Sequence, residues 1–554
     1  MKLNGSEILT EVLLEQGVDV LFGYPGGAVL NIYDALYKYR DRITHIMTAH
    51  EQGAAHAADG YARATGRTGV VLATSGPGAT NLVTGIATAY MDSVPMVCIT
   101  GNVGQSLIGR DSFQEVYIAG ITMPITKHNF VVRHVEQLAD VLRDAFRIAN
   151  TGRKGPVLVD IPKDVTAAVC EFEPGRKIEV LHDVFNDREA LLTAAKMLNA
   201  AEKPVMMFGG GVVAGEADAL VRALVEKAHI PACHTMMATG VLGYGEACDL
   251  GLVGMHGCLA ANRAVAHCDL LLAVGVRFSD RVALNPEKFA THAKILQIDI
   301  DASEINKNIM IDHSLIGDVK GILEQLVPLT EENQHAAWMA QIAQWKAEDY
   351  RPQDDDSILK PHQVVTAACD MAGEDAVVVT DVGQHQMWAA QYCRRIGPRS
   401  FLTSGGLGTM GYGYGASIGA AMAVEKKRPV VMFTGDGSFH MNMNECCTAV
   451  SYGLPIVTVI MNNTVLGMVR QWQHSFYEDR YSSTDPHRRT DFVKLAEAFG
   501  ATGYRCENLS EFKEAFAKAL QADGPVLIDC RIDKDERVLP MIPSGGTYKD
   551  SIVD

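Results

Sequence analysis

One segment near residue 430 constrains the fold more than any other part of the chain. An apolar run at residues 429–434 leads into Gly435-Asp436-Gly437-Ser438, and a second apolar run at 455–461 ends at Asn462-Asn463. Short apolar runs bounded by turn residues are typical of buried strands in parallel sheets. Glycines in the first turn let the backbone approach a ligand closely. The segment therefore predicts a strand, a sharp turn, a helix and a neighbouring parallel strand.

Polar side chains that follow these two strands indicate a metal-bridged diphosphate site. The carboxyl ends of neighbouring parallel strands meet at one edge of the sheet, so we expect Asp436 and Asn463 to lie close together. Mg²⁺ prefers hard oxygen ligands together with phosphate oxygens, and the carbonyl of Val465 is the expected third protein ligand. Gly437 and Ser438 open the helix, where a diphosphate would bind. The alternative is an ordinary strand–turn–helix unit in which Asn463 caps a turn, and the Asn-Asn ending favours the binding site.

The same alternation of apolar strands and helical stretches continues along the whole chain. It predicts an α/β protein with three doubly wound parallel-sheet domains, and 554 residues are enough for about three domains. Polar linkers divide the sequence into the expected domains 1–170, 188–330 and 360–545. No short-period repeat or low-complexity tract interrupts this order.

Charge and cysteine usage exclude several classes of protein. A net charge of -17 argues against a nucleic-acid partner, and no apolar stretch is long enough to span a membrane. The first residues enter a helical pattern without the apolar core of a signal peptide. The 12 cysteines are scattered and form no Cys-x-x-Cys pair, so thiols in a reducing cytosol are the simpler expectation. We therefore expect a cytoplasmic protein.

A second candidate site lies in the first block, where His50-Glu51-Gln52-Gly53 opens an alanine-rich stretch. A carboxylate at a helix start commonly complements the helix dipole, so capping is one interpretation of Glu51. The small residues that follow allow close packing around a buried carboxylate that exchanges protons, which is the other.

Seven blocks of sequence carry a resemblance that covers essentially the whole chain. They are residues 22–28 (FGYPGGA), 50–53 (HEQG), 74–81 (TSGPGATN), 113–115 (FQE), 380–388 (TDVGQHQMW), 405–411 (GGLGTMG) and 466–472 (LGMVRQW). Together with the Gly-Asp-Gly to Asn-Asn segment, their order resembles the catalytic large subunit of acetohydroxyacid synthase, also called acetolactate synthase, a family of thiamine-diphosphate enzymes.

The resemblance implies a function for each block. The first and third domains would bind the pyrimidine and the diphosphate of thiamine diphosphate, with Mg²⁺ on the latter. Glu51 would hydrogen-bond the aminopyrimidine and promote loss of the thiazolium proton. Because Glu51 and the diphosphate site come from different subunits in the family, a homodimer or a dimer of dimers is implied. Further residues expected at this cofactor are Gly383, Gln384, His385, Met410, Gly435 and Met468; core packing is an equal alternative for Met410.

The resemblance also implies residues at the reacting centre. Gln114 would steady an oxyanion and Phe113 would exclude water. Lys163 would line the substrate channel. Trp472 would contact the ethyl group of 2-ketobutyrate, and Arg281 would hold a carboxylate. Without the family likeness, Gln114 would be a solvated loop amide and Phe113 a core aromatic. Lys163 would be a surface lysine, Trp472 a core aromatic and Arg281 a member of a surface ion pair.

The middle domain resembles the part of this family that binds FAD, a flavin that is generally structural there. Glycines after strands are weak evidence alone, because any doubly wound domain needs tight turns. The implied FAD contacts are Arg153, Gly209, Gly210, Gly211, His256, Gly275, Arg277, Asp299 and Asp318.

The expected activity is synthesis of 2-acetolactate from pyruvate, and of 2-aceto-2-hydroxybutyrate from pyruvate and 2-ketobutyrate, for valine, leucine and isoleucine biosynthesis. A pyruvate oxidase or a simple 2-keto acid decarboxylase on the same scaffold is the alternative. A scaffold protein without chemistry would show damage at Glu51, Asp436 or Asn463, and all three are intact. The family often includes a small regulatory subunit, whose contact surface the sequence does not locate.

Overall fold

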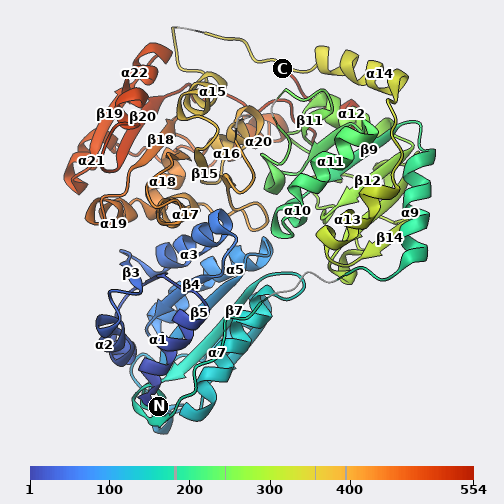
Figure 1. The fold of residues 1–554 in the computed structure, drawn as a ribbon. Helices are drawn as coiled ribbons and strands as arrows, with labels where there is room; N and C mark the ends of the chain where they lie inside the picture. The colour runs from blue at the N-terminus through green and yellow to red at the C-terminus, as the bar shows by residue number, and fades with distance from the viewer. Residues whose placement is uncertain (180–183, 244, 356, 394–395) are drawn as a thin grey trace.

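The computed structural model describes residues 1–179, 184–243, 245–355, 357–393 and 396–554. Within these residues the chain forms three six-stranded sheets, each assembled from one stretch of the sequence and each with parallel pairing between neighbouring strands (Figure 1). The prediction of three doubly wound α/β domains is confirmed. The boundaries at residues 1–170, 188–330 and 360–545 stay predictions.

The first sheet is built from residues before 163, in the order β3-β2-β4-β5-β7-β6. Its strands are β2 (Val20–Gly23), β3 (Thr44–Met47), β4 (Gly69–Ala73), β5 (Met96–Asn102), β6 (His128–Val131) and β7 (Pro156–Pro162). Its helices are α1 (Gly5–Glu15), α2 (Leu30–Lys38), α3 (Glu51–Thr65), α4 (Pro77–Asn81), α5 (Val83–Met91), α6 (Ile118–Thr122), α7 (Val135–Asn150) and α8 (Lys163–Ala167). A separate antiparallel pair joins β1 (Lys2–Asn4) to β8 (Val169–Glu171).

The middle sheet has the order β11-β10-β9-β12-β13-β14. Its strands are β9 (Pro204–Phe208), β10 (Ala232–His234), β11 (Asp249–Leu252), β12 (Leu270–Val274), β13 (Lys294–Asp299) and β14 (His313–Ile316). Its helices are α9 (Arg188–Ala200), α10 (Gly210–Ala214), α11 (Asp218–Ala228), α12 (Leu259–His267), α13 (Val319–Leu329) and α14 (Ala336–Ala347). Apolar residues cover both faces of this sheet in two separate clusters, as expected for a parallel sheet between helices.

The third sheet has the order β16-β15-β17-β18-β20-β19. Its strands are β15 (Val377–Thr380), β16 (Phe401–Leu402), β17 (Val430–Gly435), β18 (Ile456–Asn462), β19 (Thr502–Cys506) and β20 (Val526–Arg531). Its helices are α15 (Pro361–Ala372), α16 (Gln384–Tyr392), α17 (Tyr412–Ala423), α18 (Asp436–Asn442), α19 (Glu445–Ser451), α20 (Gly467–Phe476), α21 (Phe492–Phe499) and α22 (Leu509–Ala519). The two strands predicted around residue 430 are therefore β17 and β18, and they pair directly.

The first and third domains share one apolar core, because α3 packs face to face against α17 (Figure 1). Small residues let the two helices approach closely. A Cβ atom added to Gly60 would lie 2.3 Å from the carbonyl oxygen of Ala416, and one added to Gly419 would lie 1.9 Å from that of Ala57. The contact includes buried charges, since Arg63 pairs with Asp59 at 2.5 Å in the same interface. The start of α3 is therefore placed by the third domain as well as by its own sheet.

The C-terminal segment lies along the middle domain. The amide of Ile542 donates to the carbonyl of Met255 at 2.8 Å, and Asn285 Nδ2 donates to the carbonyl of Gly545 at 2.9 Å. Just before this segment, the Gln471 side chain accepts from the amide of Val538 at 2.9 Å. The tail thus connects α20 of the third domain to the middle domain.

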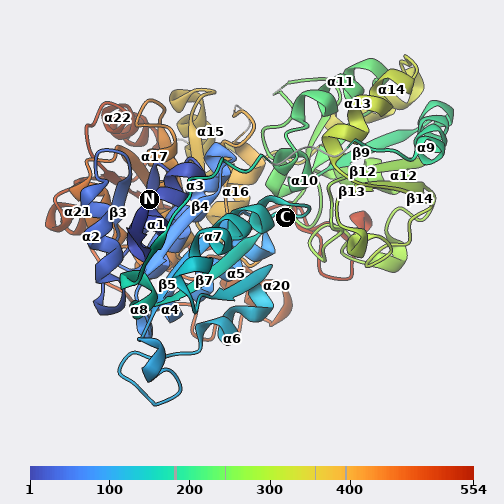
Figure 2. The same cartoon turned by 60° about the horizontal axis from the view of Figure 1, so that its bottom comes forward.

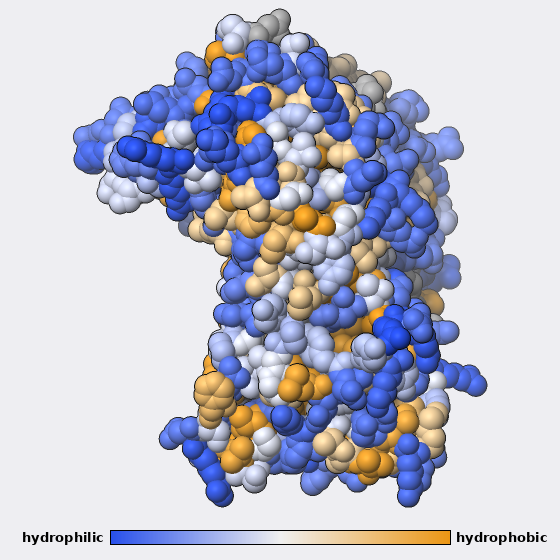
Figure 3. Space-filling view, turned by 90° about the vertical axis from the view of Figure 1, so that its left-hand side faces the viewer, coloured by the Kyte–Doolittle hydropathy of each residue, from blue (hydrophilic) through white to orange (hydrophobic). Residues whose placement is uncertain are grey.

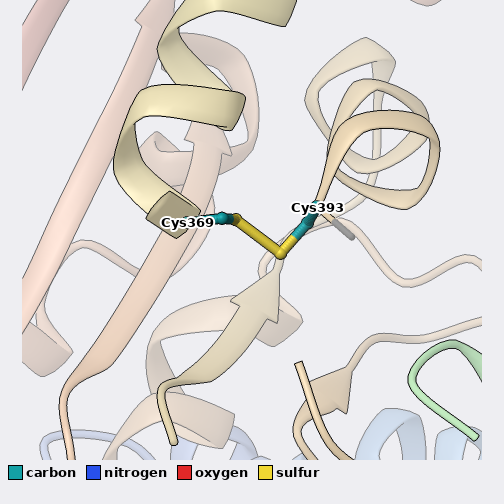
Figure 4. Close-up of a disulfide and its surroundings, with 2 residues drawn as sticks. All are labelled: Cys369 and Cys393. Atoms are coloured by element: carbon teal, nitrogen blue, oxygen red, sulfur yellow. A yellow bond between two sulfur atoms is a disulfide. The ribbon is translucent and has the colours of Figure 1, made fainter. Parts of the chain in front are cut away.

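One pair of cysteines departs from the expectation of free thiols. Cys369 on α15 and Cys393 at the end of α16 form a disulfide, with their Cα atoms 5.8 Å apart (Figure 4). They are 24 residues apart in the sequence, and only the packing of α15 against α16 brings them together. Among the described residues, the other ten cysteines are not disulfide-bonded. Within the described ranges, no helix has the length and apolar character needed to cross a membrane.

Candidate active site

The edge of the third sheet gathers the residues predicted to hold a metal ion and a diphosphate. Asp436 opens α18 directly after β17, and Asn463 follows β18, its neighbour in the sheet. Asp436 is 4% exposed, and its Oδ1 atom has no hydrogen-bond partner among the described residues. Burial raises the pKa of this carboxyl to about 6. A buried hard oxygen without a partner fits a cation site.

Asn463 connects this edge to α16. Its Nδ2 atom donates to Gln384 Oε1 at 3.2 Å, and its Oδ1 atom accepts from the amide of Val465 at 3.2 Å. Val465 is buried beside it. A Cβ atom at Gly467 would come within 2.0 Å of Gln384 Oε1, so the chain after β18 lies tightly against α16. The described residues hold no group of three or more His, Cys, Asp or Glu side chains suited to a metal.

His385 closes the other side of the same edge. Cβ atoms at Gly383 and Gly435 would lie 2.7 Å and 3.0 Å from its ring, so the imidazole lies across both glycine turns. Its Nε2 atom is buried without a partner among the described residues. Burial lowers the pKa of His385 to about 3, so the ring is neutral at physiological pH. Ser438 Oγ donates to the carbonyl of Val382 at 3.3 Å, which ties the start of α18 to the same loop.

Asp381, which was not predicted as a site residue, organises the segment around Met410. Its Oδ1 atom accepts from the amide of Gly411 at 2.7 Å, and Thr434 Oγ1 donates to its Oδ2 atom at 3.2 Å. Asp381 is buried, and burial raises its pKa. Asp381 lies inside the 380–388 block, one of the segments that carry the family resemblance, so the sequence did contain a signal for this residue. Met410 itself is half-buried.

The second group of predicted residues lies in the first domain, around the start of α3. The helix begins at Glu51, as predicted. Asn81 Nδ2 donates to Glu51 Oε2 at 3.0 Å, and a Cβ atom at Gly78 would lie 3.2 Å from Glu51 Oε1. The carboxylate is therefore held between α3 and α4, where it remains half-buried.

Gln114 lies next to Gly76, the residue directly before α4. Gly76 has φ +62, and a Cβ atom there would meet the backbone of Gln114 at 2.8 Å. Gln114 also has a positive φ of 59. By contrast, Phe113 is 87% exposed and Lys163 is exposed. Glu51 and Gln114 thus both contact the segment of residues 76–81, whereas Phe113 is largely exposed.

A cavity of about 2420 Å³ lies between the three domains. Its walls include Met468 and Trp472 of α20, and Arg281 of the middle domain. Trp472 stacks edge-on against Phe476, and Arg281 is exposed and paired with Asp280 at 2.9 Å. The walls do not include Glu51, Phe113, Gln114 or Lys163, which therefore contribute nothing to this cavity within one chain.

Most of the predicted FAD residues line the same cavity. The members that do so are Arg153, Gly210, Gly211, His256, Gly275, Arg277, Asp299 and Asp318. Gly209 is buried beside them, and a Cβ atom at Gly211 would lie 2.6 Å from the Cα of Gly275. His256 Nδ1 is buried without a partner among the described residues, and burial lowers the pKa of His256 to about 4. A large cavity with an unpartnered polar atom and close backbone walls fits a bulky ligand.

Several of these side chains already have protein partners. Arg153 pairs with Glu304 at 2.8 Å, and Asp318 caps α13 by accepting from the amide of Lys320 at 2.9 Å. Arg277 Nη1 donates to the carbonyl of Met91 at 2.6 Å, which joins the middle domain to the first. These contacts give the three side chains a structural use, and their role in binding FAD stays a prediction.

Comparisons with known proteins agree with this layout. Three family models match: the N-terminal TPP binding domain of thiamine pyrophosphate enzymes over residues 3–121, the central domain over 191–326, and the C-terminal TPP binding domain over 381–530. The chain is 47% identical to the acetolactate synthase large subunit of Mycobacterium tuberculosis, over 100% of this chain and 91% of that protein.

Two further relatives extend the similarity to other lineages. The acetolactate synthase large subunit of Parasynechococcus marenigrum is 45% identical, over 98% of this chain and 90% of that protein. A probable acetolactate synthase large subunit of Methanocaldococcus jannaschii is 44% identical, over 98% of this chain and 94% of that protein. With its three matched domains and full-length similarity, the chain belongs to the thiamine pyrophosphate enzymes and, among them, to the family of acetolactate synthase large subunits.

Proposed function

We propose that this chain is an acetolactate synthase catalytic subunit. It decarboxylates pyruvate and joins the remaining two-carbon unit to a second 2-keto acid, pyruvate or 2-ketobutyrate, in branched-chain amino-acid biosynthesis. The observation that carries the proposal is full-length similarity to acetolactate synthase large subunits. The candidate site supports it, because the chain contains both halves: Glu51 held by Asn81, and the diphosphate edge with Asp436.

The third domain is the proposed holder of Mg²⁺ and the diphosphate of thiamine diphosphate. Asp436, Asn463 and the carbonyl of Val465 would bind the metal, and the unpartnered Asp436 Oδ1 atom supports this assignment. Gly437 and Ser438 at the start of α18 would face the diphosphate. When bound, thiamine diphosphate supplies the electron sink needed for loss of CO₂ from a 2-keto acid.

The other residues would position substrates and protons. Glu51 would exchange a proton with the aminopyrimidine ring, with one carboxylate oxygen fixed by Asn81. Gln114 would donate to the substrate oxygen. Trp472 and Arg281 line the cavity, where an indole wall and a guanidinium would accept the side chain and the carboxylate of the second keto acid.

We propose that the active site is completed by a second copy of the chain. The loop between β5 and α6 protrudes from the body of the molecule (Figure 2). The loop and the segment directly after α6 expose apolar side chains, with Phe113 at 87%, Tyr117 at 70% and Met123 at 62%. Apolar residues also gather in parts of the side shown in Figure 3. Exposed apolar side chains of this size mark interaction surfaces. A homodimer or dimer of dimers would place Phe113, Gln114, Lys163 and Glu51 against the partner's diphosphate edge.

Two further components are proposed. FAD would occupy the middle-domain part of the cavity, because the glycine walls and the unpartnered His256 Nδ1 atom fit it. A small regulatory subunit is proposed because relatives bear the name "large subunit". A cytoplasmic location stays a prediction.

The experiment is product analysis of the purified chain with pyruvate and 2-ketobutyrate, omitting thiamine diphosphate, Mg²⁺ and FAD in turn. Acetolactate and acetohydroxybutyrate that disappear without thiamine diphosphate support the proposal. Acetaldehyde as the main product would indicate a decarboxylase. Acetate formed with reduction of an electron acceptor would indicate an oxidase.

A further inference from the structure

Glu445 is a buried carboxylate of the third domain that contacts the backbone directly before Glu51. It opens α19, the helix that follows α18, and it is 0% exposed. Its Oε2 atom accepts from the amide of Ala49 at 3.1 Å, and its Oε1 atom accepts from the amide of His50 at 3.0 Å. Both carboxylate oxygens are thus engaged by consecutive backbone amides of another domain.

The charge of Glu445 is stabilised by hydrogen bonds from Thr448 and from these two amides. Thr448 Oγ1 also donates to Oε2 at 2.8 Å, from the same helix. The ion pairs found among the described residues do not include Glu445. Burying a carboxylate without a neighbouring cation costs free energy unless hydrogen bonds satisfy its oxygens. The hydrogen bonds from the amides of Ala49 and His50 are therefore strong, charge-assisted ones. Burial raises the pKa of Glu445, and the nearby charge of Glu51 raises it further.

The first turn of α3 fits against the same carboxylate. A Cβ atom at Gly53 would lie 2.2 Å from Glu445 Oε1, so only a glycine leaves room there. Ala49 and His50 precede Glu51, and Gly53 follows it. One side chain of the third domain therefore constrains the backbone on both sides of Glu51.

We propose that Glu445 is a positioning residue for Glu51. Its carboxylate holds the chain at Ala49, His50 and Gly53, so that the Glu51 side chain faces the place where the aminopyrimidine binds. The inference rests on the function proposed for Glu51. Glu445 itself does not touch the cofactor; it acts through the backbone of the first domain.

The first test uses the cofactor-free protein. Glu445→Gln keeps the size of the side chain but leaves one acceptor oxygen for two amides. We expect amide hydrogen exchange at residues 49–53 to become about tenfold faster, because one amide loses its charged acceptor. Thr448→Val is the matched control, since it removes one hydrogen bond from the same carboxylate and leaves both backbone contacts. Its exchange at 49–53 is expected to stay at the wild-type rate.

The second test uses the protein loaded with thiamine diphosphate and Mg²⁺. We expect Glu445→Gln to slow hydrogen exchange at the reactive thiazolium carbon by about tenfold or more, because small misplacements of a catalytic group have effects of this size. Affinity for the cofactor and the metal should change little. Gly53→Ala, which would displace the carboxylate from the other side, should give the same defect and carries the test if Glu445→Gln does not fold.

The outcomes separate this inference from the proposed function. Wild-type exchange at residues 49–53 and at the thiazolium carbon, with only a lower melting temperature, would overturn the inference and leave Glu445 a structural residue. Glu51→Gln is the reference variant. If it slows thiazolium exchange and Glu445→Gln does not, only the positioning inference fails. If Glu51→Gln has no effect, the function proposed for Glu51 fails, and the inference fails with it.

Discussion

The close contact between α3 and α17 makes Gly419→Ala an informative substitution. In an exposed helix this change is stabilising by up to about 1 kcal/mol, because alanine has the higher helix propensity. In this protein the added Cβ would lie 1.9 Å from the carbonyl oxygen of Ala57 and 2.7 Å from the amide nitrogen of Tyr61. Both are backbone atoms, which cannot rotate away as a side chain can. The substitution therefore sets helix propensity against interhelical packing.

The size of the effect follows from these distances. Carbon and carbonyl oxygen atoms rarely approach closer than about 3.3 Å, so the helices must separate locally by about 1.4 Å. A gap of that order forfeits a large part of the dispersion attraction along the contact. Overpacking costs about 1–3 kcal/mol, and backbone atoms on both sides favour the upper end. After the propensity gain is subtracted, we expect a net loss of about 2 kcal/mol in the free energy of unfolding.

The assay compares unfolding of the wild type, Gly419→Ala and the control Gly524→Ala, whose Cβ would meet nothing within 4 Å. We expect a lower stability for Gly419→Ala alone. Its rate of acetolactate formation should fall as well, because α3 begins at Glu51 and moves with the separated helices. A Gly419→Ala variant as stable as the wild type, or more stable, would refute the interhelical contact, since propensity alone predicts that result.

Three further predictions follow from buried groups. Asp436→Asn should weaken Mg²⁺-dependent thiamine diphosphate binding by about 100-fold in calorimetry. Burial raises the pKa of Asp436 to about 6, so Asp436→Asn should also stabilise the cofactor-free protein at pH 7 by about 2 kcal/mol and have no effect on its stability below about pH 4. Equal stability of the variant and the wild type at pH 7 would contradict this expectation. A reductant should lower the free energy of unfolding of the wild type by about 2–4 kcal/mol and leave that of Cys369→Ala unchanged. An equal response of the two proteins would contradict a stabilising disulfide. Burial lowers the pKa of His56 to about 3, so the folded protein binds fewer protons than the unfolded chain and stability falls as the pH drops below about 6.5. His56→Leu should therefore remove about 2 kcal/mol of the stability difference between pH 6.5 and pH 5, and an unchanged pH dependence in this variant would contradict the assignment.

Part of the candidate site was predictable because its signals are local. Asp436 and Asn463 each follow an apolar run, and strands β17 and β18 are neighbours as expected. Glu51 opens a helix because a polar residue, small residues and an alanine-rich stretch follow one another in the sequence. These features depend on residues a few positions apart. The roles assigned to the individual site residues stay predictions.

Other features depend on residues far apart and could not be predicted. No pattern around Glu445 indicates that it accepts from the amides of Ala49 and His50, almost 400 positions earlier in the chain. Likewise, no local sequence pattern near Cys369 or Cys393 predicts that they form a disulfide. Such contacts arise only when two elements that are far apart in the sequence are packed together in the fold.

The sequence by itself therefore determined the fold class, the strand–turn–helix units and the residues that carry the resemblance to the family. Hydrophobic periodicity and turn chemistry act over a few residues, so they can be recognised in one dimension. Only the tertiary structure decided how the first and third domains share a core through α3 and α17, and which cavity the middle domain contributes to. The reason is physical: burial of a carboxylate such as Glu445, or the close approach of two helices, depends on which surfaces meet in three dimensions.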